Sequence, residues 1–404
     1  MSSIVNQKIS DVFDVENNLG HTVLIPKKEV ENYFIYDKGM RKTAICKSSL
    51  CYVDMRNGKF YIRGKETILS KNHDFLDFAF DVIFAENNPC DKKNFLSAAQ
   101  KYFTVFPEVR RVLWSLDRNI DPMDFLAIGI LSLAPIVNKY LQANNRQELA
   151  GLIIAQTSII AGSYYHLQNN QEVSARWQEQ SFTQNVMRYF HPLQSEQNIN
   201  QWATILNTML ILHCEHGMNC SAATVRNVAS AHSDVFSAIS AGIAAFKGNL
   251  HGGASRQVSQ MYDSLIASNA SPKNYIEQII KDKQPLMGFG QRTYNQIANC
   301  YDPRVLAMKE ILQDQQFDFT AIKEYKKLCF EFIEHAQSLE FFKQRNLTPN
   351  PDLFNCIFYK LFQVPSAMNP VMISLGRIVG WIANYYEHYD QKYPLSRPCD
   401  FGAE

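Results

Sequence analysis

The chain has 404 residues, of which 46% are hydrophobic and 20% are charged, and its net charge is +1. This composition supplies a large core, and the near-zero net charge gives no indication of a nucleic-acid or anionic-membrane surface. The nine cysteines are irregularly spaced and include no CxxC pair, which predicts reduced thiols rather than a disulfide framework.

The N-terminal stretch contains Asp11, Asp14 and Glu16 but no arginine. This pattern fits neither a secretory signal nor a mitochondrial transit peptide, so we expect a cytoplasmic protein. The most apolar run, residues 125–137, is shorter than the ~20 residues needed to cross a bilayer. It predicts a buried helix, and we expect no membrane association.

A short β-element is predicted near the N-terminus. The first 45 residues are weakly periodic, but residues 53–63 place Asn57-Gly58 between two short apolar stretches. Asn-Gly is a strong signal for a two-residue hairpin turn. We expect a hairpin here and little other strand.

Helical signals dominate from about residue 74 onward. Asp121-Pro122 has the residues of a helix start, with aspartate as the N-cap and proline in the first turn. Residues 152–165 and 205–216 are further helix candidates. Residues 221–246 are rich in Ala, Ser and Gly and predict one closely packed helix that ends at Lys247-Gly248.

The remaining segment alternates loop and helix. Residues 285–304 predict a loop-rich region, and helical patterning returns at 305–312, 324–339 and 371–389. The predicted fold class is therefore mainly α with a short N-terminal β-hairpin. We expect an N-terminal segment at residues 1–45. A large helical domain is expected in two pieces, residues 46–259 and 366–404, with a small domain at residues 260–365 between them in the chain.

His213 and His216 are three positions apart and share one face of the predicted helix. They fit structural histidines, a substrate site or a metal site. The spacing is not that of HExxH zinc proteases, and the P-C-x-x-C partner of zinc deaminases is missing. The pair alone leaves these three interpretations open.

Other isolated polar residues are ambiguous by themselves. His251 lies among glycines, which allow a ligand to approach the backbone closely. Gly288-Phe-Gly290 is a lone GxG without the remaining features of a dinucleotide site. Arg377 interrupts an apolar stretch, and a buried arginine requires an anionic partner from the protein or from a substrate.

Read in chain order, these pieces resemble the citrate synthase family, which includes the 2-methylcitrate synthases. The resemblance extends over roughly residues 45 to 400, and it starts with a hairpin-like stretch at 51–64. Its motifs are LHCEHGMNCSAATVR (212–226), KGNLHGGA (247–254), LMGFGQRTY (286–294), YDPR (301–304), NPDLF (350–354), GRIVGW (376–381) and SRP (396–398).

The resemblance implies a nearly all-helical fold with a large and a small domain, and a homodimer as the working unit. It implies an enzyme that condenses an acyl-CoA with a 2-oxo acid such as oxaloacetate and then hydrolyses the thioester to give citrate or a 2-alkylcitrate. No cofactor and no metal are implied, since acyl-CoA is a substrate. Such chemistry needs a base for the acyl α-proton and a donor for the enolate oxygen.

Residue roles follow by matching motifs. His251 matches the histidine that hydrogen-bonds the thioester oxygen, and Asp352 matches the base. His216 matches a histidine that binds the 2-oxo acid. In the family, arginines bind the carboxylates of that acid, and one of them reaches across the dimer. These arginines match Arg304, Arg377 and Arg397.

The CoA-binding loop matches Leu286, Met287, Gly288, Phe289 and Gly290, and Asn350 matches the residue that helps to seat the base. One departure concerns catalysis directly. The family places a histidine after G-[FY]-G, where it polarises the 2-oxo carbonyl, and this chain has Gln291. Ser255 and Asn355-Cys356 also differ from the family pattern.

Three alternatives accompany this expectation of an acyl-CoA:2-oxo-acid condensing enzyme with altered preference or rate. The chain could be an ordinary citrate or 2-methylcitrate synthase. It could be a catalytically weak homologue that binds ligands or regulates. A metal-dependent hydrolase built on His213 and His216 is the third alternative.

Overall fold

The computed structural model describes the chain over most of its length. Residues 39–40, 43–54, 57–66, 73–85, 92–141, 145–290 and 301–398 are described, together with the backbones of strands β1 (Val12–Glu16) and β2 (Thr22–Pro26). The chain divides into two compact units, residues 1–47 with 396–404 and residues 48–395.

The first unit contains an antiparallel hairpin. Strands β1 and β2 pair with Val12 opposite Pro26 and Glu16 opposite Thr22. The sequence predicted little strand beyond one hairpin, so this pair is an addition. The alternation that marks a half-buried strand is too short in either segment to stand out from a weakly periodic background.

The second unit begins with the predicted hairpin, which consists of β3 (Cys51–Asp54) and β4 (Lys59–Ile62) and is extended by β5 (Lys65–Glu66). Asp54 pairs with Lys59, so four residues connect the strands and the expected two-residue turn was wrong. The Asp54 carboxylate accepts hydrogen bonds from the Asn57 backbone and side chain. Gly58 adopts a positive φ of 62°, a conformation that favours glycine.

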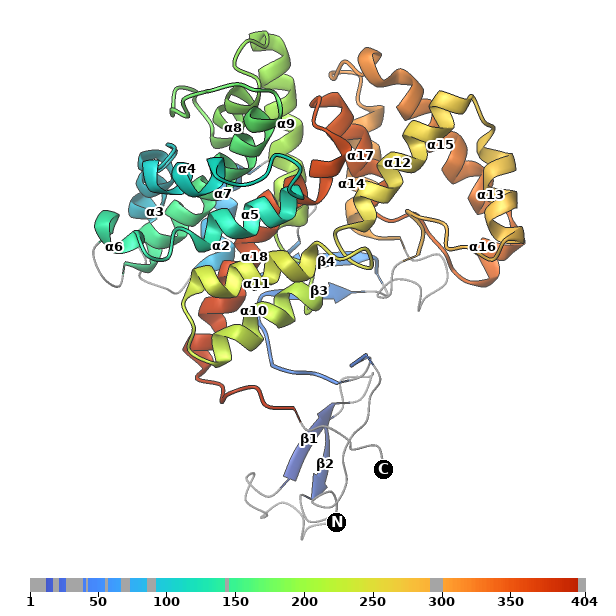
Figure 1. The fold of residues 1–404 in the computed structure, drawn as a ribbon. Helices are drawn as coiled ribbons and strands as arrows, with labels where there is room; N and C mark the ends of the chain where they lie inside the picture. Colours follow the sequence, from blue (N-terminus) through green and yellow to red (C-terminus); the bar gives the residue numbers. More distant parts are fainter. Residues whose placement is uncertain are drawn as a thin grey trace. The chain divides into compact units, whose positions relative to one another are not determined.

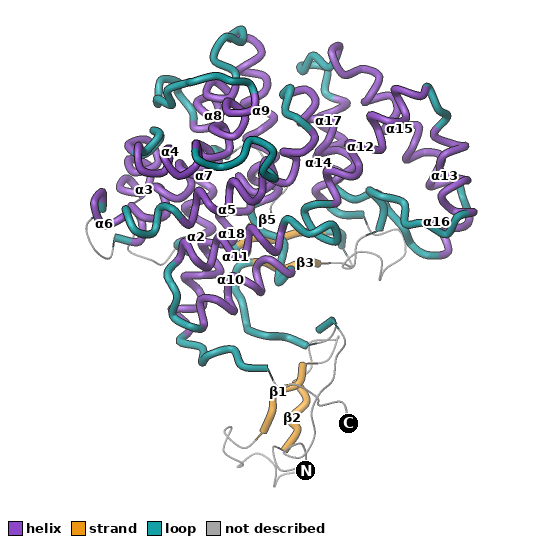
Figure 2. Tube along the Cα trace, in the orientation of Figure 1, coloured by secondary structure: helices purple, strands orange, loops and turns teal. Residues whose placement is uncertain are grey.

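The other regular elements of the described chain are helical, which confirms the mainly α prediction (Figures 1 and 2). In chain order they are α2 (Phe75–Ile83), α3 (Lys92–Lys101), α4 (Pro107–Trp114), α5 (Pro122–Leu131), α6 (Val137–Tyr140), α7 (Arg146–Gln168), α8 (Phe182–Phe190), α9 (Glu196–His213), α10 (Cys220–Ser230), α11 (Val235–Phe246), α12 (Ala254–Ser268), α13 (Pro272–Lys281), α14 (Pro303–Gln313), η3 (Thr320–Ile322), α15 (Lys323–Ser338), α16 (Glu340–Gln344), α17 (Asp352–Leu361), η4 (Ser366–Met368) and α18 (Asn369–Gln391).

Local capping chemistry fixes several of these boundaries. Asp121 is the N-cap of α5 and accepts a hydrogen bond from Met123 N, as the sequence predicted. The single helix expected over 221–246 was wrong, because the chain breaks between α10 and α11. His232 takes a φ of 61°, and the Asp234 side chain caps the new helix by accepting from Phe236 N and Ser237 N.

Helix α18 is the centre of the second unit. Every residue from Asn369 to His388 is buried, and the helix packs against α2, α7, α9, α10 and α11 (Figure 1). A helix that is covered on all sides is a core element. Residues on α18 are therefore held rigidly, which matters for the arginine at position 377.

Helices α12 to α17 gather on one side of this unit and α2 to α9 on the other (Figure 1). The division into a large and a small domain stays a prediction. Among the described residues, no helix combines the length and the apolar character that a membrane span requires.

Candidate functional site

Electrostatic interactions of two arginines link five predicted site residues in the second unit. Arg304 and Arg377 both act on His216, Arg304 acts on Asp352, and Arg377 acts on His251. These side chains come from segments far apart in the sequence, and helices α9, α14, α17 and α18 position most of them. Arg397 belongs to the first unit, and Gln291 lies outside the described residues, so the roles of both remain predictions.

The two histidines at the end of α9 are neutral. Burial, followed by the nearby Arg304, lowers the pKa of His216 well below its ordinary value and that of His213 to about 3. The His213 Nε2–H donates to Asn355 Oδ1 at 2.8 Å. The His216 ring lies 3.9 Å from an Asp302 oxygen and packs on Phe60.

Arg304 is held by an internal carboxylate. Its Nε and Nη2 donate to Asp302 at 3.0 and 2.6 Å, and both residues are buried. Burial acts to raise the pKa of Asp302, but the Arg304 guanidinium outweighs it and keeps the pKa at about 2. Asp302 also caps α14 by accepting from Arg304 N at 2.9 Å, so the pair orients the arginine at the helix start.

Arg377 has donors that the protein leaves unused. Its side chain is buried, yet Nε and Nη1 make no hydrogen bond. The carboxylate of Glu215, which is also buried, favours the charged form of Arg377. Buried guanidinium nitrogens without acceptors are unfavourable unless a ligand supplies the acceptor, so Arg377 is the best candidate for binding a carboxylate.

Two glycines bring α18 close enough to α9 to place Arg377. A Cβ on Gly376 would lie 2.6 Å from Leu210 O, and one on Gly380 would lie 2.2 Å from Cys214 O and 2.5 Å from Glu215 Oε2. These contacts are with backbone and with a fixed carboxylate, so they cannot be relieved by a flexible side chain. The GRIVGW motif is thus a close helix-packing motif with an arginine inside it.

Gly380→Ala is expected to lower the free energy of unfolding by about 1–3 kcal/mol, because the added methyl overpacks the contact with residues 214 and 215. Urea unfolding measures the change. Gly248→Ala is the matched control, since its Cβ would meet only Ala245 O at an ordinary 3.5 Å. Equal stability of the two variants would show that α18 can shift away from α9 freely.

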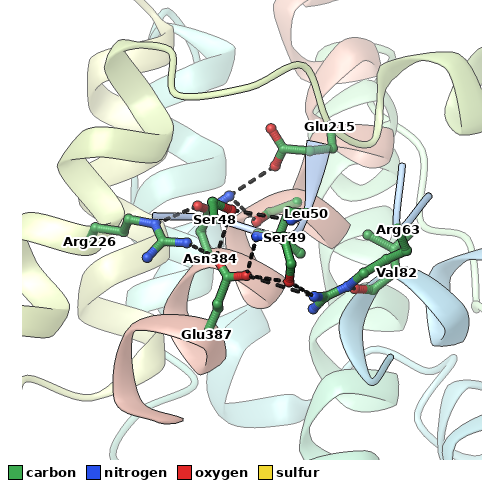
Figure 3. A network of polar contacts seen from close by, with 10 residues as sticks. Ser48, Ser49, Leu50, Arg63, Val82, Glu215, Arg226, Asn384 and Glu387 are labelled. Atoms are coloured by element: carbon green, nitrogen blue, oxygen red, sulfur yellow. Dashed lines mark hydrogen bonds and ion pairs between the residues drawn. The ribbon is translucent and has the colours of Figure 1, made fainter. Parts of the chain in front are cut away.

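A buried polar network ties the second unit's first residues to the C-terminal part of α18 (Figure 3). Glu387 accepts from Ser48 Oγ at 2.7 Å, from Ser49 N at 2.9 Å and from Arg226 of α10. Burial tends to raise the pKa of Glu387, but these donors outweigh it and lower the pKa. The network anchors the segment that leads into β3.

The same network reaches the site through Asn384 (Figure 3). Asn384 Oδ1 accepts from Arg226 Nε at 2.7 Å, and its Nδ2 donates to Glu215 Oε2 at 2.9 Å. The other Glu215 oxygen accepts from His216 N at 2.8 Å. Glu215 therefore fixes the backbone of His216 while facing Arg377. The sequence indicates no role for Glu215 beyond its place between the two histidines.

Asp352 has the protonation behaviour of a base. It begins α17 and is only partly buried, and its backbone N donates to Asn350 Oδ1 at 3.0 Å. Burial raises its pKa to about 6, although Arg304 and the Asn355 amide oppose the rise. A carboxylate with a pKa near the operating pH is well suited to remove a proton.

The loop at 286–290 is bonded to the segment that precedes Asp352. Gly290 N donates to Thr348 O and Asn350 N donates to Gly288 O, both at 2.9 Å. Gly288 and Gly290 have φ of 84° and 81°, and a Cβ on Gly288 would collide with Leu353 at 2.4 Å. The GxG motif therefore allows the loop to pack closely beside Asp352, the candidate base. Leu286, Met287 and Phe289 are half-buried against the core.

His251 sits in the turn between α11 and α12. Its Nε2 lies 3.1 Å from Ser221 Oγ, and the same hydroxyl oxygen accepts a hydrogen bond from Trp381 Nε1. Burial, followed by Arg377, lowers the pKa of His251 to about 4, so the ring is neutral. A neutral ring carries one N–H, so Nδ1 can donate to a ligand in the tautomer in which Nε2 accepts from the Ser221 hydroxyl.

Ion pairs hold both ends of this turn to the first turn of α5. Lys247 Nζ lies 2.6 Å from Asp124, and Arg256 Nη1 lies 2.9 Å from Asp121. The second pair is less exposed, and its arginine also donates to Ala367 O at 3.1 Å. The turn is therefore fixed to the core helix whose start the sequence predicted.

The metal alternative gains no support from the described residues. They contain no group of three or more His, Cys, Asp and Glu side chains arranged to hold a metal ion. One ring nitrogen of His213, Nε2, is hydrogen-bonded to Asn355.

Solved structures share this fold. The chain resembles the crystal structure of citrate synthase from Thermotoga maritima with a TM-score of 0.77 at 25% identity, covering 92% of this chain and 96% of that one. It also resembles citrate synthase from Thermoplasma acidophilum, solved as a ternary complex with carboxymethyl coenzyme A and oxaloacetate, with a TM-score of 0.79 at 22% identity, covering 91% and 96%.

Sequence comparisons agree with the structural ones. Citrate synthase from Dictyostelium discoideum is 29% identical over 90% of this chain and 73% of its own length. Citrate synthase 1 from Mycobacterium tuberculosis is 28% identical over 88% and 84%. The family model described as citrate synthase, C-terminal domain, matches residues 39–399. Because this match spans most of the chain, the protein belongs to the citrate synthase family.

Proposed function

We propose that this protein condenses an acyl-CoA with a 2-oxo acid such as oxaloacetate and then hydrolyses the thioester, giving citrate or a 2-alkylcitrate and CoA. The family and the fold support a condensing enzyme of the transferase type. The Thermoplasma relative, bound to carboxymethyl coenzyme A and oxaloacetate, supports these two substrate classes.

The observation that carries the proposal is the buried Arg377, whose Nε and Nη1 lack acceptors, beside Arg304 and the partly buried Asp352. In this function the two arginines bind the carboxylates of the 2-oxo acid, with neutral His216 donating to the same ligand. Asp352 removes the acyl α-proton, and His251 donates to the thioester oxygen as the enolate forms. Leu286 to Gly290 and Asn350 form the CoA-binding loop.

The working unit in this proposal is a homodimer in the cytoplasm, with Arg397 completing the oxo-acid site across the interface. No cofactor is needed, because the acyl-CoA brings the activated carbon. Sedimentation at micromolar concentration tests the assembly, and an active monomer would contradict the shared site.

The decisive experiment is an assay of free-CoA release over a panel of acyl-CoAs and 2-oxo acids. Release that needs both substrates supports the proposal and identifies the pair. Binding of both ligands without release would favour the catalytically weak, ligand-binding homologue. Activity that is lost on chelation would favour the metal-dependent hydrolase.

Gln291→His is expected to raise kcat with oxaloacetate more than it changes KM. Glutamine can donate only a neutral hydrogen bond to the 2-oxo carbonyl, whereas histidine can donate a charged one, which is roughly twice as strong. The gain falls in the transition state. Steady-state kinetics measure it, with Gln291→Ala as the control. If neither variant differs from the wild type, position 291 is outside the site.

A further inference from the structure

Asn355 is a fully buried amide that links two parts of the site. It lies three residues after Asp352 in the first turn of α17, so both side chains share a face of the helix. Its Oδ1 accepts the Nε2–H of His213 at 2.8 Å. Asn355 therefore joins the end of α9 to the start of the helix that carries the candidate base.

The amide oxygen of Asn355 faces the His213 ring. His213 is neutral, and an amide oxygen can only accept, so the ring hydrogen is on Nε2 and the amide nitrogen of Asn355 faces away from the ring. That nitrogen is buried and makes no regular hydrogen bond within the protein. A buried N–H without a partner is unfavourable, so its position calls for an explanation.

Asp352 supplies the explanation. The Asn355 side chain acts on the carboxylate as a donor, without the geometry of a regular hydrogen bond. Catalytic hydrogen bonds in ligand-free enzymes are often long or poorly aligned and tighten when substrate binds. We propose that Asn355 is a positioning residue that, held by His213, presents its Nδ2–H to Asp352 and stabilises the charged form of that carboxylate.

Apart from the Asn355 amide, two charged groups and several neutral ones surround Asp352. Arg304 and Asp302, at the start of α14, are the charged groups of the described chain that act on Asp352. On α17 itself, Tyr359 and Cys356 are neutral because burial raises their pKa values, and the same holds for two groups behind the helix, Cys329 of α15 and Tyr262 of α12. A change in the titration of Asp352 would thus report on the amide.

The test is the titration of Asp352 in the full chain labelled with ¹³C-carboxyl aspartate and followed by NMR, with Asp352→Asn assigning the signal. Asn355→Leu keeps the volume and removes the donor, so the pKa of Asp352 should rise by about one unit. Asn355→Ser, which shortens the side chain, should give a smaller rise. Asn369→Leu is the control, because Asn369 is also buried but bonds to Ser255 and Ser259 instead.

A second measurement distinguishes this inference from the proposed function. Only the catalytic consequence of the inference rests on the proposed function. In the Asn355 variants, the acidic limb of kcat/KM should move to higher pH by the same amount as the titration, which a purely structural role would not produce. A wild-type chain without condensation would overturn the proposed function, while the NMR titration would still decide the role of Asn355. Unchanged titration of Asp352 in folded Asn355→Leu and Asn355→Ser would overturn the inference.

Discussion

Replacing Asp352 with asparagine is expected to lower turnover by about 10²–10⁴-fold, the usual contribution of a general base. Exchange of the acyl α-proton with solvent should fall equally, because both processes need the same proton transfer. Binding of the 2-oxo acid should be retained, since Asn keeps the size of the side chain. Stopped-flow or NMR exchange and calorimetry measure these three quantities, and wild-type turnover in the variant would remove Asp352 from the mechanism.

The same variant has a pH signature. The pKa of Asp352 is raised from 3.8 to about 6, so the folded protein binds this proton more tightly than the unfolded chain does. Stability contributed by the protonated form is therefore lost as pH rises from about 4 to 6. Asp352→Asn should be more stable than the wild type at pH 8 and equally stable at pH 4, and kcat/KM of the wild type should fall below pH 6.

Features with local causes were the easiest to predict. The start of α5 follows from Asp121 and Pro122 alone, because an N-cap and a first-turn proline act on their own backbone. The break between α10 and α11 was missed, since Asp234 lies in a run of small residues that are compatible with a continuous helix. Motif matching gathered His216, His251, Arg304, Arg377 and Asp352, which the structure brings together in one region.

Features that depend on partners distant in sequence could not be predicted. Glu215 meets Asn384 and Asn355 meets His213 across more than a hundred positions, and neither spacing has a local pattern. The unused nitrogens of Arg377 are likewise a property of packing, because the sequence shows only an arginine in an apolar stretch. The sequence alone does not show whether such an arginine has an internal partner. The structure shows this difference between Arg304 and Arg377, which look alike in the sequence.

Arg304 and Arg377 should therefore respond differently to replacement by methionine. Arg304→Met leaves Asp302 as a buried carboxylate without its partner, which should lower the free energy of unfolding by about 3–5 kcal/mol. Arg377→Met removes a guanidinium with two unused nitrogens, so stability should change by less than about 1 kcal/mol. Glu215, which is buried and has a raised pKa, can take up a proton when the opposing charge is gone.

Ligand binding should show the complementary pattern. Arg377→Met should weaken the 2-oxo acid by about 10- to 100-fold, the loss of one charge-assisted contact, while binding of acyl-CoA changes little. Urea unfolding and calorimetry with each substrate measure both effects on one preparation, with the wild type alongside. If Arg377→Met were as unstable as Arg304→Met and bound the 2-oxo acid normally, Arg377 would be a structural ion-pair residue of Glu215. A stable variant that has lost the 2-oxo acid would identify the unused nitrogens of Arg377 as the anion site of this enzyme.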